Sequence, residues 1–155
     1  MENEKSKEAY SYLIKLLTKR DYSEYKLKQK LRERGFSAED TESAIQKVKD
    51  KDYLKEENYT EARVKGLMHK GMSPSYIQQK LREEKIELEI NSIIDIFTEY
   101  DYCTERQIKY LAEKKLRFKT ITDKYKTRDK VLSFVLGKGH EFSESKSIIE
   151  NILQI

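Results

Sequence analysis

Residues 22–37 read YSEYKLKQKLRERGFS, and residues 72–87, fifty positions later, read MSPSYIQQKLREEKIE. Six of the sixteen aligned positions are identical, where unrelated sequences would give about one. Leu27 and Leu31 stand four residues apart, as one face of a helix requires, and the second copy keeps this apolar pair as Ile77 and Leu81. A fixed period of this size predicts an array of structural repeats.

Local signals mark where the helix in each copy begins and ends. Ser23 and Ser73 stand at the start of each helix, where a hydroxyl can accept hydrogen bonds from free backbone N–H groups. Pro74 follows Ser73 at the first helical position, which tolerates the missing N–H. Gly35 stands where a residue in the left-handed region would end the first of these helices.

Apolar stripes before and after these helices repeat in the same order, which predicts a helix on each side. A third, more divergent copy follows, with Gly139 in the position of Gly35 and extra residues between Lys114 and Arg128. The predicted core residues are Ala9, Leu13, Leu16, Leu17, Ala44, Ile45 and Val48 in the first copy, Ile90, Ile93, Ile94 and Phe97 in the second, and Ile108, Leu111, Ala112, Val131, Phe134, Val135, Ile148, Ile149 and Ile152 in the third. The sequence therefore predicts an all-α fold of three tandem three-helix repeats, residues 1–56, 57–104 and 105–155, in an elongated, curved array.

Composition supports this interpretation. Only 37% of the 155 residues are hydrophobic, which suits stacked units with narrow apolar stripes better than one deep core. The 32 basic and 28 acidic residues nearly cancel, and Leu, Ile and Tyr recur with helical spacing, which argues against disorder. The charged start of the chain and the absence of an apolar run of about 18–20 residues predict neither a signal peptide nor a membrane span. We expect a cytoplasmic monomer, and the single Cys103 fits a reducing compartment.

Three stretches of the chain share a pattern with a known family: Leu16-Leu17, Arg20, Tyr22-Ser23, Leu27, Lys30-Leu31 and Gly35-Phe36, then Lys70-Gly71-Met72-Ser73-Pro74, Ile77, Leu81 and Lys85-Ile86, and finally Lys130-Val131, Phe134-Val135-Leu136 and Lys138-Gly139-His140. On these residues, the chain resembles the RecX family of recombinase regulators over almost its entire length. His140 departs from the pattern, since the family favours an aromatic or apolar residue there.

This resemblance implies a non-enzymatic protein that binds the RecA recombinase, chiefly as its filament on single-stranded DNA. Members of the family lie in the helical groove of that filament and restrain its growth, ATP hydrolysis and strand exchange. The resemblance thus implies a role in homologous recombination, DNA repair and the SOS response. We expect weak, salt-sensitive binding to bare DNA and no binding to membranes.

Positive charge is concentrated near the C-terminus, where residues 107–155 hold 11 basic and 6 acidic side chains. The cations of this region alternate with Tyr110, Phe118 and Tyr125. The cations could neutralise phosphates while the rings stack on unpaired bases. The alternative is an ordinary solvated surface whose aromatic residues belong to the core. The candidate contact residues in this region are Lys114, Lys115, Arg117, Lys119, Lys124, Lys126, Arg128 and Lys130.

A second basic stripe lies on the predicted helix that follows Ser23. Lys26, Lys30 and Arg34 are spaced by four residues, and like charges at that spacing repel one another. Binding to phosphates or to an acidic surface would account for the stripe, and so would solubility. The candidate contact residues in the first two repeats are Lys26, Lys30, Arg32, Arg34, Lys80 and Arg82.

The sequence offers little to support catalysis. His69 and His140 are the only histidines, and neither has metal-ligand spacing with Cys103, so we expect no metal site and no cofactor. Cys103 itself is expected to be a small buried residue at a repeat junction. Two other functions stay open besides filament regulation: a stand-alone helical nucleic-acid-binding module and an adaptor for another protein.

Overall fold

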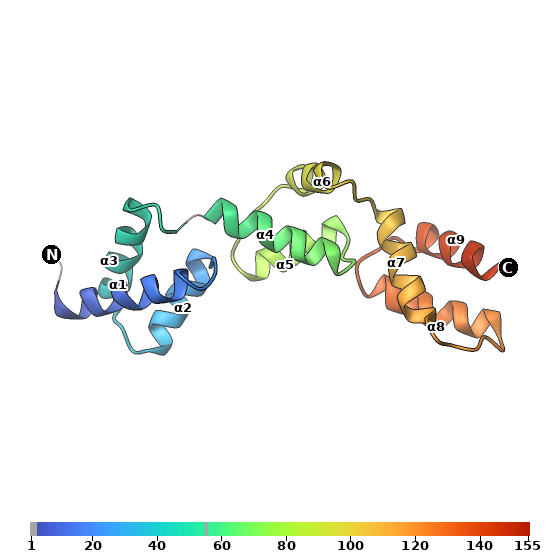
Figure 1. Cartoon of the computed structure of the whole chain (residues 1–155), viewed down its shortest axis with the longest axis horizontal. Coiled ribbons are helices and arrows are strands. Elements are labelled where there is room, and N and C mark those ends of the chain that lie inside the picture. Colours follow the sequence, from blue (N-terminus) through green and yellow to red (C-terminus); the bar gives the residue numbers. More distant parts are fainter. Residues whose placement is uncertain (1–2, 55) are drawn as a thin grey trace. The chain divides into compact units, whose positions relative to one another are not determined.

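The computed structural model of the chain describes residues 3–54 and 56–155. Over these residues it contains nine α-helices and no strand, so the prediction of an all-α protein is confirmed (Figure 1). None of the helices in this part of the chain combines the length and apolarity needed to span a bilayer. The helices are α1 (Glu4–Leu17), α2 (Glu24–Glu33), α3 (Ala38–Asp50), α4 (Glu56–His69), α5 (Pro74–Glu83), α6 (Ile90–Glu99), α7 (Thr104–Leu116), α8 (Lys124–Leu136) and α9 (Phe142–Leu153).

Serine hydroxyls cap the helices where the repeat predicted them. The Ser23 hydroxyl accepts a hydrogen bond from the N–H of Lys26 at 3.1 Å, and the Ser73 hydroxyl accepts one from the N–H of Tyr76 at 3.2 Å. These bonds satisfy donors that have no partner inside the helix. α5 begins at Pro74, as expected from the preference for proline at the first helical position.

The repeat is also visible in the backbone where helices end. A residue in the left-handed region follows α2, α5 and α8, and another follows α3, α6 and α9. The second copy uses a lysine where the first and third use glycine. The residues are Gly35, Lys85 and Gly139 after the first set of helices, and Asp52, Asp101 and Gln154 after the second.

The helices gather into two compact units. The first comprises the described residues through Arg63 together with Glu84–Ile86, and the second comprises Val64–Glu83 with Glu87–Ile155. The boundaries of three repeats stay a prediction.

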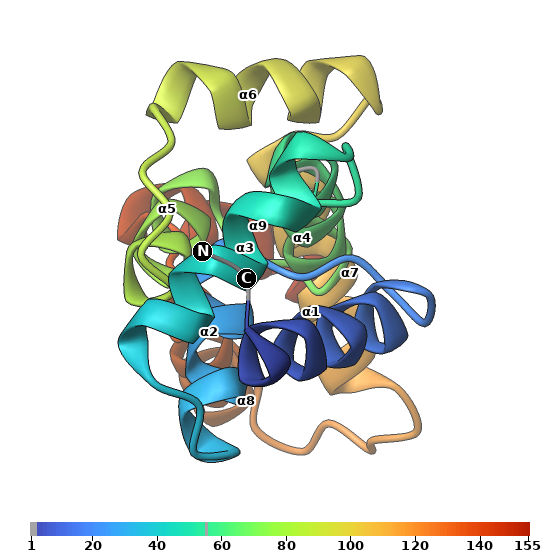
Figure 2. The ribbon, with the colours of Figure 1, turned by 90° about the vertical axis from the view of Figure 1, so that its left-hand side faces the viewer.

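In the first unit, α3 packs against both α1 and α2 (Figures 1 and 2). The residues between them are those that the apolar stripes indicated, and Leu16 and Leu17 lie partly buried against the same cluster. The fully or almost fully buried side chains include Ala9, Leu13, Leu27, Leu31, Ala44, Ile45 and Val48.

In the second unit, α7, α8 and α9 pack on one another, and α5 packs on α6. The buried side chains include Ile93, Phe97, Ile108, Leu111, Ala112, Val131, Val135 and Ile149. The prediction for Ile94 is wrong, because this residue follows Ile93 around the helix and leaves the buried face, with 44% of its surface exposed. The prediction of a buried Cys103 is also wrong: it precedes α7 in extended backbone and is exposed.

Inside the second unit, the turn that follows α8 lies directly against the start of α5. A Cβ atom built on Gly139 would lie 2.5 Å from Cβ of Tyr76 and 2.6 Å from the hydroxyl oxygen of Ser73. The N–H of Ser73 also donates to the carbonyl oxygen of Lys138 at 3.0 Å. Glycine is therefore required at position 139 both by its left-handed φ of +88° and by this close approach.

Gln107 on α7 and His140 in the α8–α9 turn add further hydrogen bonds to this contact. The buried Nε2–H of His140 donates to the carbonyl oxygen of Gly71 at 2.7 Å, while Nδ1 has no hydrogen-bond partner among the described residues. The side-chain amide of Gln107 donates to the carbonyl oxygens of Met68 and Met72 at 3.0 and 2.7 Å. Both side chains thus satisfy carbonyl groups at the end of α4.

The burial of His140 predicts a loss of stability in mild acid. Desolvation lowers the pKa of His140 below its usual value, an effect that the bond to Gly71 and the charge of Glu144 only partly offset. The unfolded chain then binds a proton more readily than the folded chain, so the stability is fully present above about pH 6.5 and declines below it. We expect a slope of at most about 1.4 kcal/mol per pH unit, measured by urea unfolding between pH 7.5 and 5.

His140→Gln should flatten this pH profile. The exposed His69 provides the matched control, and His69→Gln should leave the decline in place. An unchanged profile in His140→Gln would contradict the assignment.

Candidate nucleic-acid interface

The basic stripe on α2 makes contacts within its own unit. The guanidinium of Arg34 lies 4.1 Å from the centre of the Tyr12 ring, and the ammonium of Lys30 lies 5.5 Å from that of Tyr22. Arg20 reaches the same Tyr22 ring at 4.6 Å. These cation–π contacts offset part of the repulsion along the stripe. The charges of Lys30 and Arg34 therefore have a partly structural explanation, and Lys26 and Arg32 are exposed on the same helix.

The two candidates on α5 have acidic neighbours. The ammonium of Lys80 lies 3.7 Å from a carboxylate oxygen of Glu83, and Nε of Arg82 lies 3.4 Å from one of Glu87. Lys80 also lies 5.4 Å from the centre of the Tyr76 ring. Their charges are partly compensated, so they are weaker candidates than unpaired cations.

Two of the C-terminal candidates help to hold the second unit together. Nη1 of Arg128 on α8 bonds to a carboxylate oxygen of Glu150 on α9 at 3.1 Å, and its Nη2 lies 3.2 Å from Asp129. The ammonium of Lys115 lies 5.0 Å from the centre of the Phe134 ring. We assign Arg128 a structural role that the sequence could not distinguish from a binding role.

The other candidate cations of this region have no such partners among the described residues. In the part of the chain that the structure describes, no carboxylate oxygen lies within 4.0 Å of their charged groups. They are Lys114, Arg117, Lys119, Lys124, Lys126 and Lys130, all of them exposed.

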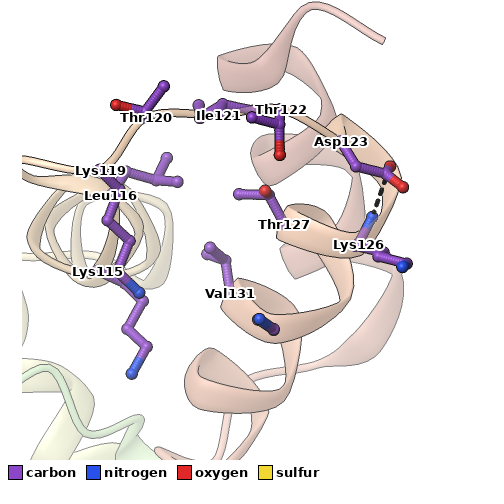
Figure 3. A pocket seen from close by; sticks show the side chains of 11 residues that line it. Lys115, Leu116, Lys119, Thr120, Ile121, Thr122, Asp123, Lys126, Thr127 and Val131 are labelled. Atoms are coloured by element: carbon purple, nitrogen blue, oxygen red, sulfur yellow. Dashed lines mark hydrogen bonds between the residues drawn. The ribbon is translucent and has the colours of Figure 1, made fainter.

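Four lysines line a hollow of about 210 Å³ between the end of α7, the loop 117–123 and the start of α8 (Figure 3). Figure 2 shows this loop, in orange, extending from the ends of the two helices. Leu116, Ile121 and Val131 supply apolar lining. The lysines that line the hollow are Lys115, Lys119, Lys126 and Lys130.

Hydroxyl groups also line this hollow, and the excess of positive charge in the sequence did not indicate them. Thr120, Thr122 and Thr127 take part in the lining, and Thr122 and Thr127 face the space between the loop and α8 (Figure 3). The alternation of threonine with lysine over residues 119–127 is the sequence signal that could have indicated them.

The aromatic residues near these cations do not belong to the core. Phe118 is 99% exposed, Tyr125 61% and Tyr110 45%. The interpretation of these three rings as core residues is therefore wrong. Phe118 also has a φ of +63°, an uncommon value for a residue with a bulky side chain.

Comparisons with known proteins cover most of the chain. A family model described as "RecX, first three-helix domain" matches residues 9–47. Proteins named "Regulatory protein RecX" are similar over most of their length: that of Haemophilus ducreyi is 31% identical over 84% of this chain and 83% of its own, and that of Vibrio campbellii is 31% identical over 90% and 86%. The protein of the same name from Haemophilus influenzae (strain PittEE) is 25% identical over 91% and 92%.

Solved structures have the same fold. The crystal structure of RecX from Lactobacillus salivarius superposes with a TM-score of 0.71 at 22% identity, covering 97% of this chain and 98% of that one. A second crystal structure, of a regulatory protein RecX, gives a TM-score of 0.69 at 21% identity and covers 97% of this chain and 71% of that one.

Proposed function

The chain belongs to the RecX family, and from this premise we propose that it binds the filament formed by the RecA recombinase on single-stranded DNA and inhibits its activity. Similarity over 84% to 91% of the chain to proteins named as regulators is the observation that supports the proposal. It acts in the cytoplasm as a monomer and without a cofactor, by binding rather than by catalysis.

The mechanism we propose is multivalent. Successive three-helix repeats each make a modest contact with the filament, and their covalent linkage raises the effective concentration of the second and third contacts once the first has formed. A chain that bridges neighbouring subunits resists the conformational cycle of ATP turnover, because each subunit must move relative to the next. Filament growth and strand exchange are restrained for the same reason.

The test is the ATPase activity of RecA on single-stranded DNA. We expect the protein to inhibit the steady-state rate at ratios well below one molecule per RecA subunit, because one bound molecule constrains several subunits. Adding the protein before and after filament assembly separates blocked growth from inhibition of the assembled filament. An unchanged rate at saturating protein in both orders would overturn the proposal.

The unpaired cations around residues 114–130 favour a second candidate, a stand-alone nucleic-acid-binding module. Under the filament proposal, affinity for bare DNA is weak and falls steeply between about 50 and 200 mM salt, because binding releases counterions. Tight, sequence-selective binding to naked duplex at the upper salt concentration would favour the stand-alone module instead.

A further inference from the structure

We propose that the hollow between α7, the loop 117–123 and α8 is a binding site for backbone phosphate groups of a nucleic-acid strand, with Phe118 as the stacking surface for an adjacent base. The proposal rests on the proposed function in naming where the DNA of the filament would be contacted. The site is built within one compact unit.

Two lysines of the hollow lack, among the described residues, the carboxylate partners that several other lysines of the chain have. Lys28 lies 2.9 Å from Glu42, and Lys109 lies 3.0 Å from Glu105. Lys119 and Lys130 have no carboxylate within 4.0 Å among the described residues, although both border the same small space. Gathering like charges without compensation disfavours folding, so a ligand that carries negative charge is the natural partner.

The acid in the lining does not cancel this charge. Asp123 caps α8, and its Oδ1 accepts hydrogen bonds from the N–H groups of Tyr125 and Lys126 at 3.0 and 3.2 Å. The negative charge of Asp123 therefore lies at the positive N-terminal end of α8. Lys126 points away from the hollow (Figure 3), and Lys115 lies against the Phe134 ring. Lys119 and Lys130, both in the lining, remain as the cations for a bound phosphate.

Size and hydroxyl groups narrow the class of ligand. A hollow of about 210 Å³ is smaller than the 300–1,000 Å³ of typical small-molecule sites. It is large enough to hold phosphate groups. The hydroxyl groups of Thr122 and Thr127 can donate hydrogen bonds to phosphate oxygens, as serine and threonine do in nucleic-acid complexes.

Phe118 provides the reason to prefer a strand to a free polyphosphate. Its ring is 99% exposed and stands beside Lys119 in the same loop. Bases stack on aromatic side chains without regard to sequence, so a base joined to a phosphate in the hollow would have a stacking partner in the Phe118 ring. A free polyphosphate would gain nothing from this ring.

The experiment measures fluorescence anisotropy of a labelled oligothymidylate at low salt, without recombinase. K119E/K130E should weaken binding about tenfold or more and lower the slope of log affinity against log salt by about 1.4, the value for two phosphates of a single strand. K7E/K19E is the matched control, because it makes the same change in charge at exposed lysines that are neither in the hollow nor among the candidate contact residues. Its affinity should stay within about threefold of the wild type.

Two more variants distinguish binding through specific hydrogen bonds and stacking from non-specific electrostatic attraction. T122V/T127V keeps every charge and should still weaken binding several-fold. F118A should weaken oligothymidylate binding but leave competition by inorganic tripolyphosphate unchanged. Circular dichroism melting verifies that each variant folds.

Three results would overturn the inference: equal losses in the two charge-reversed pairs, unaltered binding in both K119E/K130E and T122V/T127V, or a hollow that binds tripolyphosphate while F118A binds oligothymidylate normally. Because the assay contains no recombinase, the phosphate site can be disproved while the protein still inhibits the RecA ATPase. Conversely, the oligothymidylate results can stand even if the protein does not inhibit the ATPase. The two proposals therefore fail separately.

Discussion

Replacing Gly139 by alanine is expected to lower the free energy of unfolding by roughly 2–4 kcal/mol. Alanine at a φ of +88° is strained, and its Cβ would stand 2.5 Å from Cβ of Tyr76 and 2.6 Å from the Ser73 hydroxyl. Cβ of Tyr76 cannot swing aside as the end of a flexible side chain can, so the backbone must separate. Urea unfolding followed by circular dichroism measures the loss.

Gly35 offers the matched control for this substitution. Its φ of +85° is almost the same, but no heavy atom lies within 4 Å of the Cβ that would be added. Gly35→Ala should therefore cost only the conformational strain, about 1 kcal/mol. Equal losses in the two variants would mean that the contact between the α8–α9 turn and α5 contributes nothing to stability.

The all-α class and most of the core were predictable because they depend on local spacing. Ser23 and Ser73 cap helices, and the apolar stripes of α1 to α3 are buried, since both properties follow from positions along one helix. Lys85 was not predictable as a left-handed residue, because glycine marks that position in the other copies and lysine gives no such signal. Ile94 was predicted to be buried because it lies at the edge of an apolar stripe. Whether such a residue is buried depends on which helices pack against that edge, and the sequence does not show this.

The candidate site was predictable in outline only. An excess of basic residues marks residues 107–155, but charge along the chain does not reveal which cations have partners. Arg128 bonds to Glu150, 22 residues away, and that pairing depends on how α8 packs against α9. The exposure of Phe118 likewise follows from the path of the α7–α8 loop, because an aromatic residue between lysines is equally compatible with a core position.

Reversing the charges of the hollow is expected to weaken inhibition of the RecA ATPase about tenfold or more, measured as the concentration of K119E/K130E that halves the rate on single-stranded DNA. Linked contacts multiply their effects, so the loss of one contact reduces the effective concentration available to the others. K7E/K19E, which has the same net charge as K119E/K130E, should stay close to the wild type. If K119E/K130E loses affinity for oligothymidylate yet inhibits the ATPase as well as the wild type, the hollow binds DNA but contributes little to inhibition. The α2 surface, with Arg32 exposed and Lys26 and Lys30 on the same helix, would then be the next candidate contact with the filament.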